Sequence, residues 1–245
     1  MGSLAKRGLT LGVVGLTLWG TGSVRAATGP SSSAAAVTAL LSEATDGTHG
    51  NADSFGPRLS ADGTTVAFVS RATNLAGAAP GSGAVARAAL QAIFVRDPLR
   101  GQTVRVSDGP GGAAADGDCT SPALSGDGSV VAFDSFASNL VSGDSNDASD
   151  VFVFDRSSGR TTRVSVASDG KQGNGDSFSP SLSADGRFVA FASEATALVP
   201  GDHNRKEDVF VFDRRTGETA LVSQTSDGKP ANGDSFDPVL SADGR

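Results

Sequence analysis

Two short acidic segments combine residue types and spacing that could hold a cation. The segments read DSNDASD and DHNRKED, and both follow the pattern D-x-N-x-x-x-D. The candidate ligands are Asp144, Asn146, Asp150, Asp202, Asn204 and Asp208. Carboxylate and amide oxygens are the ligands that calcium prefers. Asp and Asn also build turns through their own side-chain hydrogen bonds. Because the distal glutamate of an EF-hand is missing, calcium sites and structural turns both remain open.

A second set of carboxylates precedes a short segment that recurs along the chain. Its members are Asp53, Asp118, Asp176 and Asp234. If these positions and the two acidic segments lie on one face of a repeated fold, that face is acidic. Such a face is either a solvated rim or a site around a channel mouth that binds a ligand.

Other catalytic chemistry has little support in the sequence. The motifs GxSxG, HExxH, GxxxxGK[ST] and GxGxxG are absent. His49 and His203 fall in predicted loops, where a surface histidine is the simpler interpretation. Cys119 stands where other copies have serine, so we interpret it as a small-residue substitution and not as a nucleophile. We predict no catalytic residue and no cofactor other than calcium, and so no enzyme in this chain.

The elements that position these residues recur with a fixed period. The element "LS-x-DG" places leucine at 59, 124, 182 and 240, separated by 65, 58 and 58 residues. An aspartate that closes an apolar run recurs at 97, 155 and 213. Self-similarity at this period predicts stacked supersecondary units. We place repeats at about 51–109, 116–170 and 174–228, with a truncated copy at 232–245.

Each repeat has the pattern of a four-stranded antiparallel meander. Short β-rich runs alternate with turn signals such as Asp185-Gly186, and helical periodicity is absent. Third strands are predicted at about Ile93–Arg96, Val151–Phe154 and Val209–Phe212. Runs such as VFVF are apolar on both faces, so each sheet is expected to lie between two neighbours, with Phe152 and Phe210 buried there. Arg96 breaks this pattern, and we expect the first sheet to be partly open.

Stacked four-stranded sheets are typical of a β-propeller or of a linear array. The segment TALLSEATDG, with an outer strand predicted at 38–47, matches TALVSQTSDG of the third repeat. A leading outer strand is how a propeller closes its ring, which favours the propeller. The fold class is therefore all-β, a β-propeller of four-stranded antiparallel blades present as an incomplete, about three-blade arc.

The element "P-x-L-S-x-DG-x-x-x-AF", followed by "DVFVFD", resembles the WD40-like or PD40 repeats of TolB-like β-propellers. The matching positions are Pro57, Pro122, Pro180, Pro238, Asp62, Asp127, Asp185 and Asp243. The resemblance covers about residues 38–245 and implies a propeller fold, whereas propellers host many activities. The chain departs from TolB in having no room for its separate α/β domain, and from eukaryotic WD40 blades in lacking the WD dipeptide.

The first 26 residues have the pattern of a signal peptide. Lys6 and Arg7 precede the apolar run LTLGVVGLTLWG, and Val24 and Ala26 are small residues at the cleavage positions. An uncleaved N-terminal anchor is the alternative. Residues 27–37 form a linker before the repeats at 38–245. The Ala- and Gly-rich composition is typical of a GC-rich bacterium, so we predict a protein that is secreted or periplasmic, with no stable membrane anchor after cleavage.

The net charge of the mature chain limits the classes of partner that it can bind. Three basic residues lie in the leader, so residues 27–245 carry 17 basic and 27 acidic residues, a net charge of −10. This balance disfavours nucleic acid and anionic membranes. We predict a non-catalytic exported propeller that binds a protein, peptide or glycan. The alternative is the propeller module of a secreted hydrolase of prolyl-oligopeptidase type whose catalytic domain lies beyond residue 245. We also expect further 58-residue copies there, because closure takes about four to eight blades.

The leader generates the first prediction. Because Val24 and Ala26 mark a cleavage site after residue 26, the exported protein is expected to begin at Ala27. Edman sequencing of protein secreted from a bacterial host measures this directly. A chain that retains Met1 or Gly2 contradicts the prediction.

Overall fold

The computed structural model describes residues 39–76 and 90–244, and its compact unit begins at Leu41. The predictions for the leader at 1–26 and for the linker at 27–37 lie outside the described residues. The fold below is that of the compact unit.

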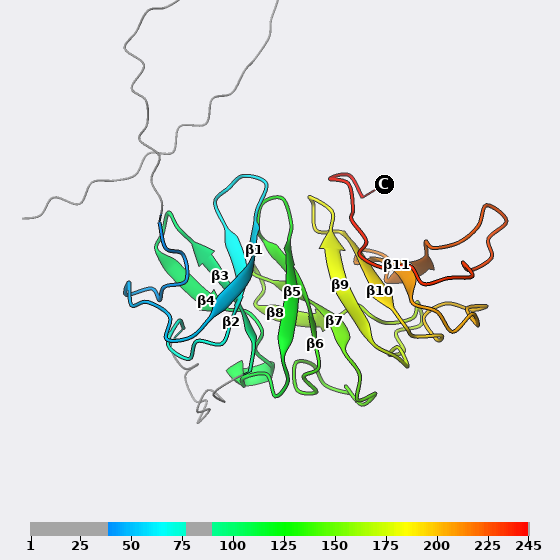
Figure 1. Ribbon diagram of the computed structural model, residues 1–245, viewed down its shortest axis with the longest axis horizontal. Coiled ribbons are helices and arrows are strands. Elements are labelled where there is room, and N and C mark those ends of the chain that lie inside the picture. The colour runs from blue at the N-terminus through cyan, green and yellow to red at the C-terminus, as the bar shows by residue number, and fades with distance from the viewer. Residues whose placement is uncertain (1–38, 77–89, 245) are drawn as a thin grey trace, which may run out of the picture. The chain divides into compact units, whose positions relative to one another are not determined.

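Three antiparallel sheets of four strands follow one another along the chain (Figure 1). The first contains β1 (Ser54–Leu59), β2 (Val66–Ser70), β3 (Ala92–Asp97) and β4 (Gln102–Arg105). The second contains β5 (Cys119–Leu124), β6 (Val130–Ser135), β7 (Asp150–Asp155) and β8 (Arg160–Arg163). The third contains β9 (Ser177–Leu182), β10 (Phe188–Ser193), β11 (Asp208–Asp213) and β12 (Glu218–Leu221).

Within each sheet the strands keep their chain order, so every sheet is a meander. The described residues contain one 3-10 turn, η1 (Pro110–Gly112), and no α-helix. None of the three sheets is closed, and they match an incomplete propeller of three blades. The predicted all-β class is confirmed, and the third strands β3, β7 and β11 lie where the apolar runs predict them.

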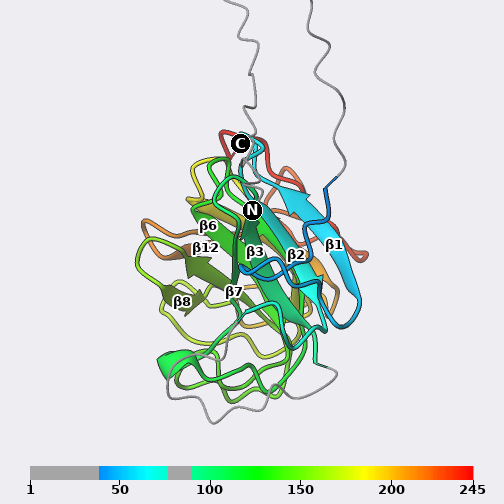
Figure 2. The same ribbon diagram turned by 90° about the vertical axis from the view of Figure 1, so that its left-hand side faces the viewer.

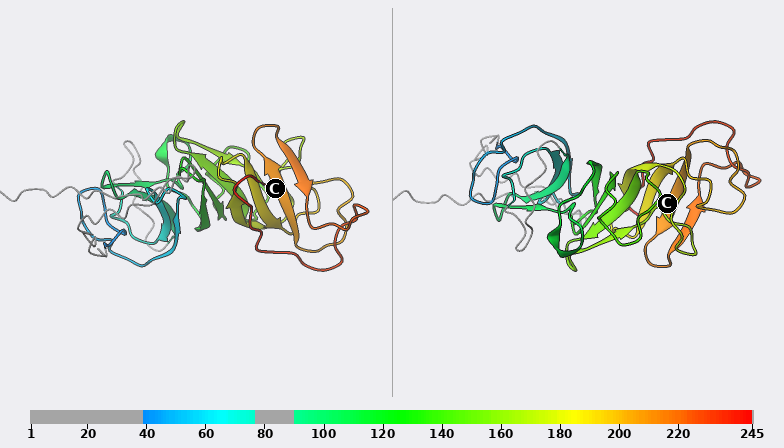
Figure 3. Two further views of the ribbon diagram at one scale, coloured as in Figure 1. Left: turned by 90° about the horizontal axis from the view of Figure 1, so that it is seen from above. Right: turned by 90° about the horizontal axis from the view of Figure 1, so that it is seen from below.

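Neighbouring sheets lie face to face (Figures 1 and 3). Apolar side chains fill the space between them. Phe133 and Phe152 of the second sheet pack on the small residues of the first, such as Ala67 and Val95. The opposite face of the second sheet is thin, and Phe210 of the third sheet packs against it. Phe152 and Phe210 are both fully buried. The predicted pairing of a bulky face with a thinner one is confirmed.

The bulky face of each sheet is built around one pair of stacked phenylalanine rings. The pairs Phe68–Phe94, Phe133–Phe152 and Phe191–Phe210 have ring centroids 5.8, 5.9 and 5.9 Å apart. Each pair joins the second strand of a sheet to the third, at positions directly opposite one another. Such cross-strand aromatic pairs stabilise a sheet and also fill the space between layers.

The first sheet is covered where the sequence predicted an opening, so that prediction is wrong. Arg96 is only 6% exposed. Its guanidinium forms an ion pair with Glu43 and donates to the carbonyl oxygens of Ala44 (3.2 Å) and Gly101 (3.0 Å). It also donates to the hydroxyl of Thr103 at 3.0 Å. Five fixed donors allow a buried arginine to replace a phenylalanine when carbonyl oxygens surround it.

The segment that supplies Glu43 does not form the predicted outer strand. Among residues 39–47, Glu43 makes only an isolated bridge to His49, so the strand prediction for 38–47 is wrong for its described part. In the third sheet the matching segment is a strand only over Glu218–Leu221, where it pairs with β11. A strand needs a run of paired residues, and within the described part of the chain residues 39–47 have only this single bridge. The truncated copy likewise contains no strand within 232–244.

The "LS-x-DG" element closes the hairpin between the first two strands of each repeat. In every copy the serine hydroxyl donates to the aspartate, at 2.6 to 2.8 Å. In the three complete copies the same hydroxyl accepts a backbone N–H five residues on, at 2.9 or 3.0 Å. The carboxylate accepts the backbone N–H that follows the glycine in these copies. The motif is therefore a self-contained turn.

These turns also link successive repeats through backbone hydrogen bonds. The bonds run from Ala61 N to Gly126 O (2.9 Å), from Gly126 N to Ala184 O (2.8 Å) and from Ala184 N to Ala242 O (2.9 Å). In the second, third and truncated copies the glycine after the aspartate lies against the preceding repeat, at Gly128, Gly186 and Gly244. A Cβ at Gly186, where φ is +66°, would lie 2.8 Å from a methyl group of Val130. Turn geometry and close approach therefore both require glycine at this position.

Gly186→Ala and Gly63→Ala separate these two requirements. Both glycines have positive φ, but only Gly186 contacts a neighbouring repeat, since nothing lies within 4 Å of a Cβ at Gly63. We expect Gly63→Ala to lower the free energy of unfolding by about 1 kcal/mol through backbone strain. Gly186→Ala is expected to cost about 1–3 kcal/mol more through overpacking. Urea denaturation measures both, and equal losses would show that the contact between repeats contributes nothing.

Candidate functional site

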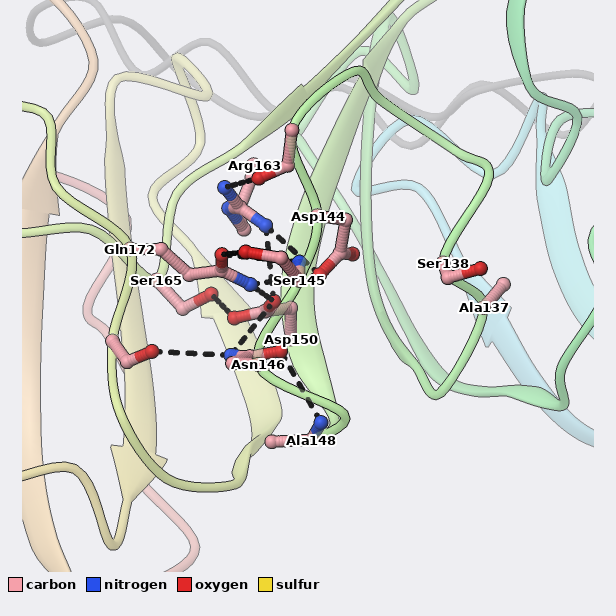
Figure 4. Close-up of polar contacts among 12 residues, drawn as sticks. Ala137, Ser138, Asp144, Ser145, Asn146, Ala148, Asp150, Arg163, Ser165 and Gln172 are labelled. Carbon is pink, nitrogen blue, oxygen red and sulfur yellow. Dashed lines mark hydrogen bonds and ion pairs between the residues drawn. The ribbon is translucent and has the colours of Figure 1, made fainter.

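The acidic segment of the second sheet forms a closed polar network (Figure 4). Asp150, at the start of β7, is fully buried. Its carboxylate accepts hydrogen bonds from the Ser165 hydroxyl (2.5 Å), the Gln172 amide (3.0 Å) and the Arg163 guanidinium (3.3 Å). Asn146 donates to the same carboxylate at 3.3 Å. The predicted candidates Asn146 and Asp150 therefore do lie together.

Asp144 completes this network through the same two partners. Its carboxylate accepts from the Gln172 amide at 2.7 Å and lies 3.1 Å from the Arg163 guanidinium. Burial raises the pKa of Asp150, while the hydrogen bond from Ser165 and the charge of Arg163 oppose that rise. Arg163 thus occupies the position between the carboxylates that a cation would take.

The acidic segment of the third sheet has the same carboxylates with fewer partners. Asp208 accepts hydrogen bonds from the Asn204 amide and the Ser223 hydroxyl, both at 2.6 Å. The Asn204 amide also donates to the carbonyl oxygen of Ala231 at 2.9 Å. Asp202 is 1% exposed, and its Oδ1 has no hydrogen-bond partner. Burial, with the charge of Asp208 as the next cause, raises the pKa of Asp202.

Asp144 with Asp150 and Asp202 with Asp208 form two acidic clusters, which we call the acidic pockets of the second and third sheets. Sequence analysis missed the residues that distinguish these two pockets. Arg163 and Gln172 of the second repeat correspond, 58 residues on, to Leu221 and Pro230. A comparison of the copies at the ends of the fourth strands would have found this difference. Within the described residues no three His, Cys, Asp or Glu side chains gather in a metal-binding cluster. Each pocket therefore offers two carboxylates.

The second set of aspartates connects neighbouring sheets. Asp118 accepts the backbone N–H of Gln91 at 2.8 Å, and Asp176 accepts that of Ser149 at 2.8 Å. In both cases the N–H of the next residue returns a bond to the same partner's carbonyl oxygen, at 2.9 and 2.7 Å. Asp234 repeats the contact on Glu207 with a longer bond of 3.4 Å. These carboxylates therefore hold the residue that precedes the third strand of the preceding sheet. Asp53, at the same repeat position, is exposed.

A groove of about 510 Å³ opens beside Asp234. It is lined by Asn174, Glu194, Thr196, Arg205, Lys206, Glu207 and Asp234. Lys206 and Asp234 form a partly exposed ion pair of 3.3 Å. Burial, with the charge of Glu194 as the next cause, raises the pKa of Glu207. The groove therefore presents both signs of charge on loops that rigid strands support.

The remaining candidates have simple environments. Cys119 is fully buried, and its sulfur lies 3.2 Å from the Ser135 hydroxyl, in the place of the Ser177–Ser193 pair of the third sheet. Burial raises the pKa of the Cys119 thiol to about 12, so it is protonated at neutral pH. His49 and His203 are exposed.

In the part of the chain that the structure describes, no helix is long and apolar enough to cross a membrane.

Comparison with solved structures finds TolB and other β-propeller proteins. TolB from Acinetobacter baumannii is 17% identical over 71% of this chain and 44% of its own, with a TM-score of 0.30. The β-propeller domain of the Trilobed protease from Pyrococcus furiosus is 16% identical over 69% of this chain and 41% of its own, with a TM-score of 0.40. Acylaminoacyl peptidase from Pyrococcus horikoshii is 18% identical over 70% of this chain and 25% of its own, with a TM-score of 0.41. The chain spans less than half the length of these three proteins.

No family model and no curated protein matches the sequence. The described strands by themselves define the class, an all-β chain of propeller blades. The likeness to solved structures, at these identities and TM-scores, carries nothing about activity.

Asp176→Ala tests the connection between sheets. Removing the carboxylate leaves the buried N–H of Ser149 without its acceptor, so we expect the free energy of unfolding to fall by about 1.5–3 kcal/mol. Asp53→Ala is the matched control, because the exposed Asp53 occupies the same repeat position, and its change should stay within about 0.5 kcal/mol. Thermal and urea denaturation measure both variants. A neutral Asp176→Ala would mean that the contact is dispensable.

Proposed function

We propose that this chain is an exported, non-catalytic platform of the TolB-like propeller type that binds a polar ligand in the groove beside Asp234. The ligand is a protein segment, a peptide or a glycan. The observation that carries the proposal is the groove itself, because it combines a ligand-sized volume of about 510 Å³ with exposed groups of both charges.

The position of the groove supports this role. Its lining comes from the segment before β9, the connection between β10 and β11, and the segment after β12. The strands behind it are tied by the Phe191–Phe210 pair and by the bonds to the second sheet. Binding groups on loops that a rigid scaffold holds lose little entropy when a ligand binds.

Charge supports an extracellular setting and limits the ligand class. A net charge of −10 after removal of the leader repels nucleic acid and anionic membranes. Arg205 and Lys206 nevertheless place two cations at the groove, next to Glu207 and Asp234. A ligand that carries both hydrogen-bond donors and acidic groups fits this pattern.

Screening purified protein, produced without residues 1–26, against peptide and glycan arrays tests the proposal. For the best array ligand, Lys206→Glu is expected to weaken binding at least tenfold, because it breaks the Lys206–Asp234 pair and reverses a groove charge. Lys171→Glu is the matched control, since Lys171 is exposed and lies outside the lining, paired only with Asp169. Binding to Lys171→Glu should equal that of wild type.

Two results would contradict the proposal. Equal loss of binding in Lys206→Glu and Lys171→Glu would place the ligand away from the groove. Hydrolysis of chromogenic ester or peptide substrates by the purified chain, at a rate above the uncatalysed one, would contradict the non-catalytic role. Such hydrolysis would favour the hydrolase alternative.

A further inference from the structure

The two acidic pockets have the same carboxylates but different compensation of their charge. The second and third sheets each place one aspartate in the connection after the second strand and another at the start of the third strand. In the second sheet these are Asp144 and Asp150, and in the third sheet they are Asp202 and Asp208. All four belong to the residues that the sequence singles out for calcium.

In the second sheet, protein groups provide the positive charge. The Arg163 guanidinium lies 3.1 Å from Asp144 and 3.3 Å from Asp150, and its side chain is 11% exposed. The Gln172 amide bridges the same carboxylates at 2.7 and 3.0 Å (Figure 4). Buried carboxylates need such partners, because desolvation otherwise destabilises the charged form. This pocket is complete without a ligand.

In the third sheet, the residues that would do the same are missing. Leu221 and Pro230 stand at the positions of Arg163 and Gln172, and neither side chain can donate a hydrogen bond. Among the described residues, no lysine or arginine forms a salt bridge with Asp202 or Asp208. Asp202 is 99% buried, and its Oδ1 is without a partner.

We propose that Asp202 and Asp208 hold a calcium ion in the third sheet, at the position that the Arg163 guanidinium fills in the second. The orphaned oxygen of Asp202 is one ligand, and the Asp208 carboxylate is the other protein anion. The cation supplies the positive charge that the substitution of arginine by leucine removes. One sheet therefore binds a cation and its neighbour does not.

The available ligands favour calcium over other metals. Both anions are carboxylates, and the Ser223 hydroxyl and the Ala231 carbonyl lie beside them, while the Asn204 amide donates its NH2 group to Asp208 and to Ala231. Calcium accepts six to eight oxygen ligands in flexible geometry, with water in the open positions, whereas magnesium demands an octahedron and dehydrates reluctantly. With two carboxylates the dissociation constant is expected at about 10⁻⁴–10⁻³ M, the range of extracellular modules.

Protonation of Asp202 is the alternative way to neutralise its buried charge. Burial and the nearby charge of Asp208 raise the pKa of Asp202, while a hydrogen bond from the Asn204 backbone N–H and then the charge of His203 oppose that rise. A protonated Asp202 would need no metal. Calcium and a proton therefore make opposite predictions for the response of the folded protein to added metal.

Calorimetric unfolding at neutral pH, with calcium chloride against EDTA, tests the proposal. Calcium at ten times its dissociation constant is expected to raise the Tm by about 3–6 °C. Asp202→Asn keeps the shape of the side chain and is expected to abolish this shift. Asp144→Asn is the matched control in the second sheet and should keep it. Magnesium chloride at the same concentration should give less than half of the calcium shift.

A double substitution provides the second variant. Leu221→Arg with Pro230→Gln introduces into the third sheet the two side chains that neutralise the carboxylates of the second. We expect it to abolish the rise in Tm with calcium while the chain stays folded in EDTA. The proposal fails if wild type shows no shift, since Asp202 is then protonated or otherwise satisfied. It also fails if Asp144→Asn and Asp202→Asn lose the shift equally. Array binding in the groove is measured separately, so either idea can fail alone.

Discussion

The whole structure depends on covering sheets that are apolar on both faces. The central strands β6, β7 and β10 are almost entirely buried, and a phenylalanine pair on one side meets valine and alanine on the other. Burial of a phenylalanine side chain contributes about 1.5–3 kcal/mol, and each pair fills a gap that only a thin neighbouring face leaves open. A sheet of this kind is stable only when its neighbours are present, and this explains why the unit is repeated.

Polar groups around that apolar stack bond one another and the backbone. Each hairpin turn bonds its own serine and aspartate, and the turns bond one another along the row of sheets. Asp118 and Asp176 fix the start of a third strand in the sheet before them. The first sheet faces the viewer in Figure 2. In this sheet Arg96 forms an ion pair with Glu43. Four of the eight candidate carboxylates, Asp118, Asp144, Asp150 and Asp176, therefore make structural contacts within or between sheets.

Differences between copies, and not the repeat itself, create the functional candidates. Arg163 closes the pocket of the second sheet, and Leu221 leaves the corresponding pocket with two uncompensated carboxylates. Likewise Asp118 and Asp176 connect sheets, whereas Asp234 lies on an open groove with Lys206. Regular spacing maintains the fold, while two differences between the repeats, Leu221 in place of Arg163 and Pro230 in place of Gln172, change the groups that surround the acidic loop.

The sequence by itself determined the period, the four strands of each repeat and the burial of Phe152 and Phe210. These features follow from local turn chemistry and from the alternation of side chains along a strand. It also identified the acidic pairs as neighbours. Only the tertiary structure decided which of them were compensated. Arg163 and Gln172 lie 13 and 22 residues from Asp150, and Glu43 lies 53 residues from Arg96. Arg163 meets Asp150 because β8 pairs with β7, and Gln172 reaches the same carboxylate from the connection after β8. Glu43 reaches Arg96 from the segment before the first sheet. No pattern within a single segment of the sequence encodes these contacts.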